Sequence, residues 1–245
     1  MNFLRSIVVL FHTLFTYFLS AFVITFLVLP LLVTLLFVPA DNNRFVFFLL
    51  DLFYKSILFI LFVPLQILGK ENIPQEPSII VGNHQSSLDI VLVGSLMQRH
   101  PHTWYALAYY AHVFFLGFFV RRLGIPVSHE NGGSAARALI DGIKFAQTEQ
   151  GHIILFPEGG RFADGTVHEF WKGFALLARS SKRPVVPVFM PYNGKVKPPF
   201  SFWLYWHPLV AVVGPQFLYQ ENDTDEIFVE RVYTWFVQEN KKYNQ

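Results

Sequence analysis

The feature that most constrains this chain is an unbroken apolar stretch near its N-terminus. No charged side chain occurs from Ser6 to Ala40, and His12 is the one residue there that titrates near neutral pH. A helix needs about 20 residues to cross a hydrocarbon core of roughly 30 Å, so this stretch is long enough to span a membrane. A secretory signal peptide is the alternative, since Arg5 resembles a short basic leader. However, the apolar core is too long for one and no small-residue cleavage site follows.

A second apolar segment follows after a polar break at residues 40–44. It runs from Phe45 to Leu68 and contains only two charged residues, Asp51 and Lys55. These lie four residues apart, so on a helix they share one face and can pair with each other. The sequence therefore predicts that residues 1–70 form a membrane-associated two-helix hairpin. The hairpin either crosses the bilayer or enters and leaves one leaflet.

Composition supports a lipid environment. Hydrophobic residues make up 53% of the chain and charged residues only 15%, whereas soluble domains carry about a quarter charged residues. The net charge is +2 and the basic residues form no run, which excludes a nucleic-acid partner of the usual kind. The chain has no cysteine, so disulfides, zinc–thiolate sites and a cysteine acyl-enzyme are excluded.

From residue 71 to residue 245 the pattern becomes that of an α/β domain. Short β-rich runs alternate with segments of helical spacing, which predicts a mixed sheet flanked by helices. The predicted strands are Ser78–Val81, Ile153–Phe156 and Val185–Met190, and the predicted helices are Ala135–Gln150 and a C-terminal helix from Asp225.

The first chemically suggestive cluster directly follows the first predicted strand. His84 comes after Gly82, and Asp89 lies five residues further on. A carboxylate that holds one imidazole nitrogen leaves the other free as a general base, and α/β sheets place their sites at the carboxyl ends of strands. The alternative is structural, with His84 capping a turn and Asp89 solvated in a first helical turn.

A second cluster, Phe156 to Arg161, follows another predicted strand. It places Glu158 and Arg161 around Gly159 and Gly160. Glycine lets the backbone approach a ligand, and the arginine fork suits phosphate. A structural turn with a surface ion pair is the alternative.

In combination these clusters resemble the 1-acylglycerol-3-phosphate acyltransferase (lysophosphatidate acyltransferase) family of HxxxxD glycerolipid acyltransferases. Asn83, His84 and Asp89 match the family's first motif. The segment Phe156–Arg161 matches its third, and Val186–Val188 matches its fourth. The resemblance covers roughly residues 73–213.

The resemblance implies direct acyl transfer without a covalent enzyme intermediate. His84, oriented by Asp89, would deprotonate a lysophospholipid hydroxyl, which attacks the thioester of acyl-CoA or acyl carrier protein. The acceptor would be 1-acyl-sn-glycerol-3-phosphate, bound by Glu158, Gly159 and Arg161, and no cofactor or metal is expected. The hairpin would hold the site against a membrane, with the active site on the cytoplasmic face where the donors are.

The second motif departs from the family pattern. Residues 117–130 have its general shape, but His129 or Glu130 stands where the family has an arginine that helps to hold phosphate. Arg121 and Arg122 would be substitute phosphate ligands, or alternatively interfacial anchors. The departure leaves another lysophospholipid or a lyso-aminolipid open as the acceptor.

Two rival functions remain at this point: a silent lipid-binding protein that retains the fold, and a membrane hydrolase that releases fatty acid. Two further features carry alternatives of their own. His100 and His102 have a metal-like spacing but no accompanying acidic cluster. The aromatic segment Phe200–Trp206 would lie at the membrane interface, over the acyl chain, or in the core.

Overall fold

The N-terminal apolar stretch is one continuous helix in the computed structural model, which describes residues 3–40, 43–128, 132–148 and 150–243. It consists of α1 (Phe3–Val23), a π-helical turn (Ile24–Val28) and α2 (Leu29–Phe37). The π-helical turn lies just before Pro30, which has no backbone N–H to donate. Within the described residues this 35-residue helix is the one segment long and apolar enough, by length and composition, to cross a membrane.

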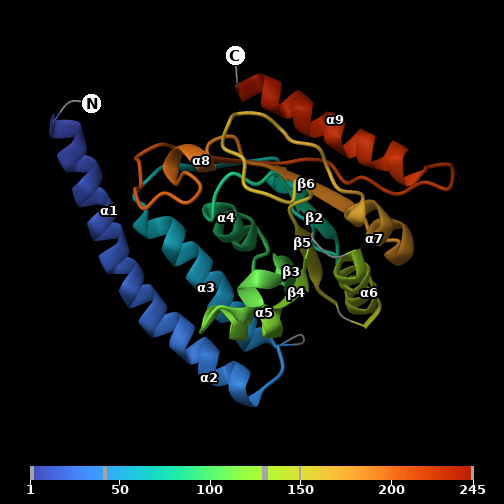
Figure 1. Cartoon of the computed structure of the whole chain (residues 1–245), viewed down its shortest axis with the longest axis horizontal. Coiled ribbons are helices and arrows are strands. Elements are labelled where there is room, and N and C mark those ends of the chain that lie inside the picture. The colour runs from blue at the N-terminus through green and yellow to red at the C-terminus, as the bar shows by residue number, and fades with distance from the viewer. Residues whose placement is uncertain (1–2, 41–42, 129–131, 149, 244–245) are drawn as a thin grey trace.

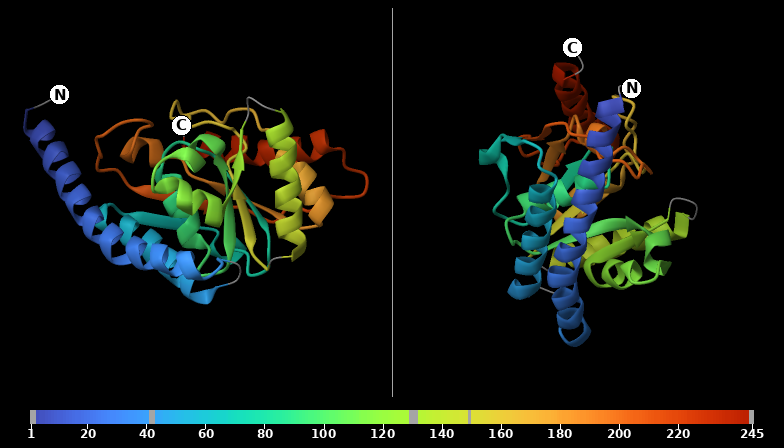
Figure 2. Two further views of the ribbon diagram at one scale, coloured as in Figure 1. Left: turned by 60° about the horizontal axis from the view of Figure 1, so that its bottom comes forward. Right: turned by 90° about the vertical axis from the view of Figure 1, so that its left-hand side faces the viewer.

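The second arm of the hairpin is α3 (Arg44–Ile60). Its N-terminus is capped by Asn43, whose side chain accepts hydrogen bonds from the backbone N–H groups of Phe45 and Val46. As predicted, Lys55 pairs with Asp51, at 2.8 Å. The left view of Figure 2 shows the α1–α2 helix lying along α3 at one side of the sheet.

The second arm is shorter than the apolar pattern predicts. The helix ends at Ile60, and Leu65–Leu68 forms strand β1, which pairs in parallel with β7. A four-residue run such as Leu65–Leu68, which is mostly exposed at the edge of the sheet, fits an edge strand as well as a helix end, so periodicity alone could not separate the two. The predicted domain boundary at residue 70 stays a prediction, with β1 on its N-terminal side.

The described strands form a single mixed sheet in the order β1-β7-β6-β2-β5-β3-β4. Every neighbouring pair is parallel except β6 and β7. The strands are β1 (Leu65–Leu68), β2 (Ile79–Gly82), β3 (His102–Leu107), β4 (Gly124–Val127), β5 (His152–Leu155), β6 (Val185–Phe189) and β7 (Leu209–Val213). The predicted mixed sheet and its three predicted strands are thus confirmed.

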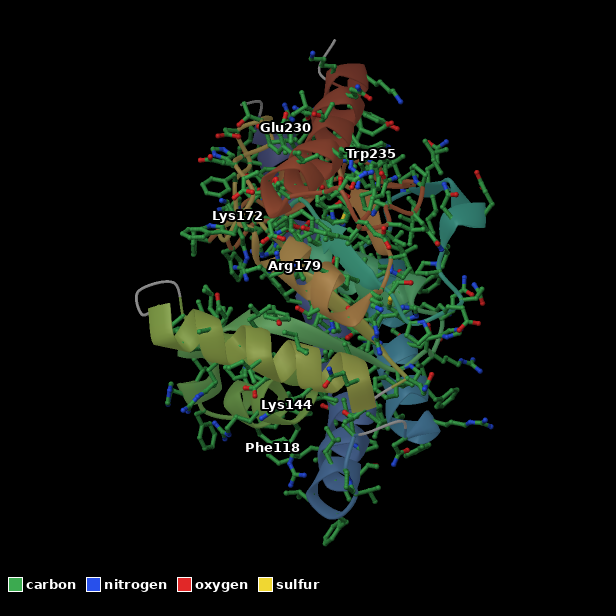
Figure 3. The ribbon with its side chains drawn as sticks, turned by 90° about the vertical axis from the view of Figure 1, so that its right-hand side faces the viewer. Phe118, Lys144, Lys172, Arg179, Glu230 and Trp235 are labelled. Atoms are coloured by element: carbon green, nitrogen blue, oxygen red, sulfur yellow. The ribbon has the colours of Figure 1, made fainter. Side chains whose placement is uncertain are left out.

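Helices cover both faces of the sheet. Alternate residues of β2 enter different cores, with Ile80 packed toward α3 and α4 (Leu88–Leu96) and Ile79 and Val81 packed toward the opposite layer. Figure 3 shows that layer, made of α6 (Gly132–Thr148), α7 (Gly173–Ser181) and α9 (Asp225–Tyr243). The shorter elements are the 3-10 turns Lys70–Asn72 and Ala108–His112 and the helices α5 (Leu116–Leu123) and α8 (Asn193–Val196).

Candidate active site

Three adjacent parallel strands end at one edge of the sheet. Strand β2 lies between β5 and β6, so the segments that follow these three strands come together there. The backbone N–H of Phe162, in the loop after β5, donates to the His84 carbonyl at 2.8 Å. The N–H of Gly194, in α8 after β6, donates to the Gln85 side chain at 3.3 Å. The two clusters predicted from the sequence, around His84 and around Arg161, therefore lie at one site, and α8 packs beside them.

The central contact joins His84 to Asp89. The Nδ1 atom of His84 lies 2.7 Å from Oδ2 of Asp89, and the carboxylate is fully buried in the first turn of α4. The same oxygen accepts backbone N–H groups from Gln85 at 2.6 Å and Ser86 at 2.7 Å. Because Asp89 only accepts, Nδ1 carries the ring proton of a neutral imidazole, and Nε2 is left with a lone pair. This is the tautomer that a general base requires.

Asn193 holds the second oxygen of Asp89. Its Nδ2 donates to Oδ1 at 2.8 Å, and the side chain is fully buried in α8. Pattern reasoning missed this residue, because α8 is a single short turn without a periodic signal. One signal could have found it: Asn193 follows the third predicted strand, and polar side chains after that strand reach the edge where His84 lies.

The outward nitrogen of His84 faces Arg161. The Nε of Arg161 lies 3.2 Å from Nε2 of His84, and arginine can only donate, so Nε2 accepts. The imidazole ring also stacks on Phe156, with centroids 4.1 Å apart and planes 5° apart. The His84 ring is therefore fixed by a carboxylate, an aromatic face and a guanidinium.

The side chain of Glu158 contacts the backbone of the loop that carries His84. Its Oε2 accepts the His84 backbone N–H at 3.4 Å, whereas its buried Oε1 has no hydrogen-bond partner among the described residues. Burial raises the pKa of Glu158 to about 8, outweighing the opposing effect of the hydrogen bond from His84. The Asp89 carboxylate adds to the rise. Glu158 is thus mostly a neutral acid at pH 7, which removes a negative charge from a site that also contains Arg161.

The turn between Phe156 and Arg161 depends on Gly159. Its φ is +70°, in the left-handed region, and its N–H donates to the Phe156 carbonyl at 3.2 Å. A side chain at this position would be strained. The turn brings Glu158 and Arg161 back toward the two sides of His84, so the predicted cluster is one structural unit.

Arg121 and Arg122 do not join this group. Their backbone precedes β4, which runs parallel to β3, so it lies near the opposite, amino-terminal edge of the sheet, while the Arg121 side chain reaches back to the turn that follows β3. Arg121 donates to the carbonyl of Ala111, and the guanidinium of Arg122 lies 5.7 Å from the ring centroid of Phe118. His129 and Glu130, at the altered position of the second motif, lie outside the described residues.

The His100/His102 pair is structural. His102 is buried, its Nδ1 lies 2.9 Å from the carbonyl of His100, and its Nε2 lies 3.2 Å from the Tyr54 hydroxyl. Burial lowers the pKa of His102 to about 4, so it stays neutral. Among the described residues no group of three acidic or histidine side chains could hold a metal ion.

The aromatic segment Phe200–Trp206 lies against the hairpin and is largely exposed. The Tyr17 hydroxyl, on α1, donates to the carbonyl of Phe202 at 2.8 Å, and Trp206 Nε1 donates to the carbonyl of Phe62 at 3.0 Å. Phe200 is 92% exposed and Trp206 61% exposed, which argues against the core interpretation. Exposed aromatics beside an apolar helix are typical of a membrane-facing surface.

The chain is similar in sequence to several proteins named as acyltransferases. The chain is 29% identical over 187 residues to a 1-acyl-sn-glycerol-3-phosphate acyltransferase of Saccharomyces cerevisiae, a match covering 74% of this chain and 61% of the yeast protein. It is 26% identical over 193 residues to the protein of that name from Borreliella burgdorferi, covering 75% and 76% of the two chains. The matches span 61%, 46% and 45% of the lengths of the yeast, Brassica napus and Limnanthes alba relatives, all three carrying this activity in their names.

The fold has a close counterpart among solved structures. The crystal structure of the 1-acyl-sn-glycerophosphate (LPA) acyltransferase PlsC from Thermotoga maritima superposes with a TM-score of 0.81, covering 97% of each chain at 24% identity. That likeness shows a shared fold. The family model for Acyltransferase matches residues 64–191, which is more than half of the chain and includes both His84 and Arg161. The chain therefore belongs to the Acyltransferase family.

Proposed function

We propose that this protein transfers a fatty acyl group from acyl-CoA or acyl carrier protein to the free hydroxyl of 1-acyl-sn-glycerol-3-phosphate, giving phosphatidate. The observation that carries the proposal is the buried His84–Asp89 pair at 2.7 Å, whose outward nitrogen faces Arg161. A base prepared on one side and a phosphate-binding cation on the other suit an acceptor that carries both a hydroxyl and a phosphate.

In the proposed reaction, Arg161 turns from His84 to the acceptor's phosphate and the acceptor hydroxyl takes its place at Nε2. The hydroxyl proton passes to Nε2 as the oxygen attacks the thioester carbon. The new C–O bond forms, the C–S bond breaks, and the imidazolium returns its proton to the leaving thiolate. Asp89 stabilises the imidazolium in between, and Glu158, as a neutral acid, adds no negative charge beside the acceptor's phosphate.

The apolar α1–α2 helix and the exposed aromatic segment support a membrane-bound enzyme whose lipid substrates arrive from the bilayer. We place the active site on the cytoplasmic face because thioester donors are made there. The second candidate is the same reaction on another lysophospholipid or a lyso-aminolipid, favoured by the missing arginine of the second motif.

The test is transfer by purified protein in nanodiscs, with radiolabelled acyl-CoA, a panel of lysolipids, and His84→Ala and Asp89→Ala in parallel. Labelled phosphatidate from the wild type alone is the expected result. Label on a different lysolipid would retain the mechanism and change the acceptor. Label only in free fatty acid would favour a hydrolase. No product with any lysolipid, with acyl carrier protein also offered as donor, would favour a silent lipid-binding protein.

A further inference from the structure

Lys197 directly follows α8 and lies beside the catalytic loop. Its backbone N–H donates to the Asn193 carbonyl at 3.0 Å, and its own carbonyl accepts the Ser86 hydroxyl at 2.7 Å. The preceding Gly194 is packed against both Gln85 and Ala163. The backbone at Lys197 is therefore fixed to the loop that carries His84 and to the loop that carries Arg161.

The side chains of Lys197 and Arg161 form an uncompensated positive pair. Lys197 is partly buried, and its pKa is lowered by burial and then by the charge of Arg161. The two cations belong to one site because the segment from Gly194 to Lys197 packs on the loops that carry His84 and Arg161. Within the described part of the chain neither forms an ion pair with a carboxylate. The nearby Glu158 is mostly neutral, as described above. Two adjacent cations without a counter-ion form a site that a bound anion would stabilise.

The position of Lys197 also fits a lipid anion. Its Nζ donates to the carbonyl of Ser201, in the exposed aromatic segment that packs on α1, and leaves two N–H donors for a ligand. Lys197 thus lies between the surface assigned to the membrane and the base. A glycerolipid headgroup whose chain remains in the bilayer must place its phosphate in this intermediate region.

We propose that Lys197, together with Arg161, binds the phosphate of the acceptor lipid and so determines its preference for a phosphomonoester headgroup. This inference rests on the proposed function. Lys197 would supply, from a different part of the chain, the second cation that the altered second motif lacks. Arg161 provides a planar fork and Lys197 a mobile point charge, so one phosphate accepts from both.

The test compares Lys197→Met, Lys197→Arg and Lys195→Met with the wild type. Lys195 is the matched control: it carries the same charge two residues away, is exposed, and lies 4.6 Å over the Tyr192 ring. For each variant, KM and kcat are measured with 1-acyl-sn-glycerol-3-phosphate and, separately, with acyl-CoA, because the phosphates of CoA have the same chemistry as the acceptor's. Melting temperatures establish that each variant is folded.

We expect Lys197→Met to raise the acceptor KM by about 10- to 100-fold, as for a lost hydrogen bond between charged groups, with the KM for acyl-CoA unchanged. Lys197→Arg should restore most of the acceptor affinity, and Lys195→Met should resemble the wild type. An unchanged acceptor KM in Lys197→Met, or a raised KM for acyl-CoA instead, would overturn the assignment. A wild type that acylates no phosphate-bearing lysolipid would overturn the proposed function itself, which separates the two failures.

Discussion

The Nε of Arg161 lies 3.2 Å from Nε2 of His84, the ring nitrogen that faces away from Asp89. Arg161 therefore occupies the position that a hydroxyl must take to give up its proton. In the proposed reaction the same contact would keep water away from Nε2 while no acceptor is bound. The guanidinium would leave Nε2 of His84 only for a group that binds it more strongly. A phosphate is such a group, because it accepts two hydrogen bonds from the guanidinium at once. In the proposed reaction, phosphate binding and exposure of the base are thus one event.

Replacing Arg161 should uncouple these two effects. Arg161→Ala should raise the KM for lysophosphatidate by about 10- to 100-fold, because a charge-assisted contact is lost. It should also increase the share of acyl-CoA hydrolysed to free acid, because water gains access to Nε2. Both products are counted in one assay with labelled acyl-CoA. Arg161→Lys keeps the positive charge but loses the planar fork of the guanidinium. Its KM and its share of free acid should therefore lie between those of the wild type and Arg161→Ala. A lower share of free acid in Arg161→Ala than in the wild type would contradict the shielding role.

Substitutions in the His84–Asp89 pair should cause a large and specific loss of turnover. His84→Ala should abolish transfer, and Asp89→Asn should lower kcat by about 10²- to 10⁴-fold, because an amide neither fixes the required tautomer nor stabilises the imidazolium. A second histidine–aspartate pair, His168 and Asp164, lies at a comparable 2.8 Å, but its side chains are 34% and 53% exposed, against 12% and 0% for His84 and Asp89. Its variant His168→Ala serves as the matched control and should keep kcat within a few-fold. An equal loss of kcat in His84→Ala and His168→Ala would show that His84 has no special role.

We expect Asn193 to position Asp89 through the hydrogen bond to its Oδ1. Asn193→Ala removes a buried donor from Oδ1, so we expect the free energy of unfolding to fall by about 1–3 kcal/mol. The carboxylate would gain freedom to rotate, so kcat should fall about tenfold while the KM for either substrate stays constant. Asn193→Ser, which keeps a shorter donor, should recover part of the kcat. If kcat is unchanged while stability falls, the role of Asn193 is structural only.

The sequence predicts most of the sheet core and the meeting place of the His84–Asp89 pair with Glu158 and Arg161 for the same physical reason. Strongly apolar runs such as Ser78–Val81 can only be buried, and residues that follow parallel strands must meet at one edge. His84, Asp89, Glu158 and Arg161 were found in this way. Asn193 and Lys197 were not, because a one-turn helix has no periodicity to reveal it.

The two predicted residues that the structure does not bring to His84, Arg121 and Arg122, precede a strand that was not recognised in the sequence. Strand β4 is four residues long and contains Gly124 and Pro126, so it gives no clear strand signal. Without β4, nothing in the pattern placed Arg121 and Arg122 at the opposite edge from His84. The length of α3 was overestimated for a related reason: the pairing of Leu65–Leu68 with β7 is a long-range contact that local periodicity does not report.

Glu158 should make stability depend on pH with a definite sign. Burial raises its pKa from 4.5 to about 8, so between these values the folded chain holds a proton that the unfolded chain has lost. The stabilisation is fully present below about pH 4.5 and is lost as the pH rises through about 8. Relative to Glu158→Gln, which stays neutral, the wild type should lose up to about 5 kcal/mol over this window.

The measurement for Glu158 is the melting temperature of both proteins in detergent at a series of pH values. The control is Glu226→Gln. Hydrogen bonding and ion pairing with Lys172 lower the pKa of Glu226 to about 2, so its difference from the wild type should not change between pH 4.5 and pH 8. A constant difference for Glu158→Gln across the same range would show that Glu158 is charged in the folded protein.

The exposed aromatic face of the hairpin should bind lipid directly. Phe11 and Phe15 stack at 5.8 Å on α1, and Phe15 stacks at the same distance on Phe62, all three being substantially exposed. Replacing Phe11 and Phe15 by Glu removes apolar area and introduces charges that resist transfer into lipid, so partitioning onto vesicles should fall about tenfold or more. Ile227→Glu is the control, because Ile227 is 50% exposed but belongs to α9, in the layer on the other face of the sheet. Cosedimentation with vesicles containing anionic lipid measures the bound fraction. Equal binding by the double variant and the wild type would mean that this face does not contact the bilayer.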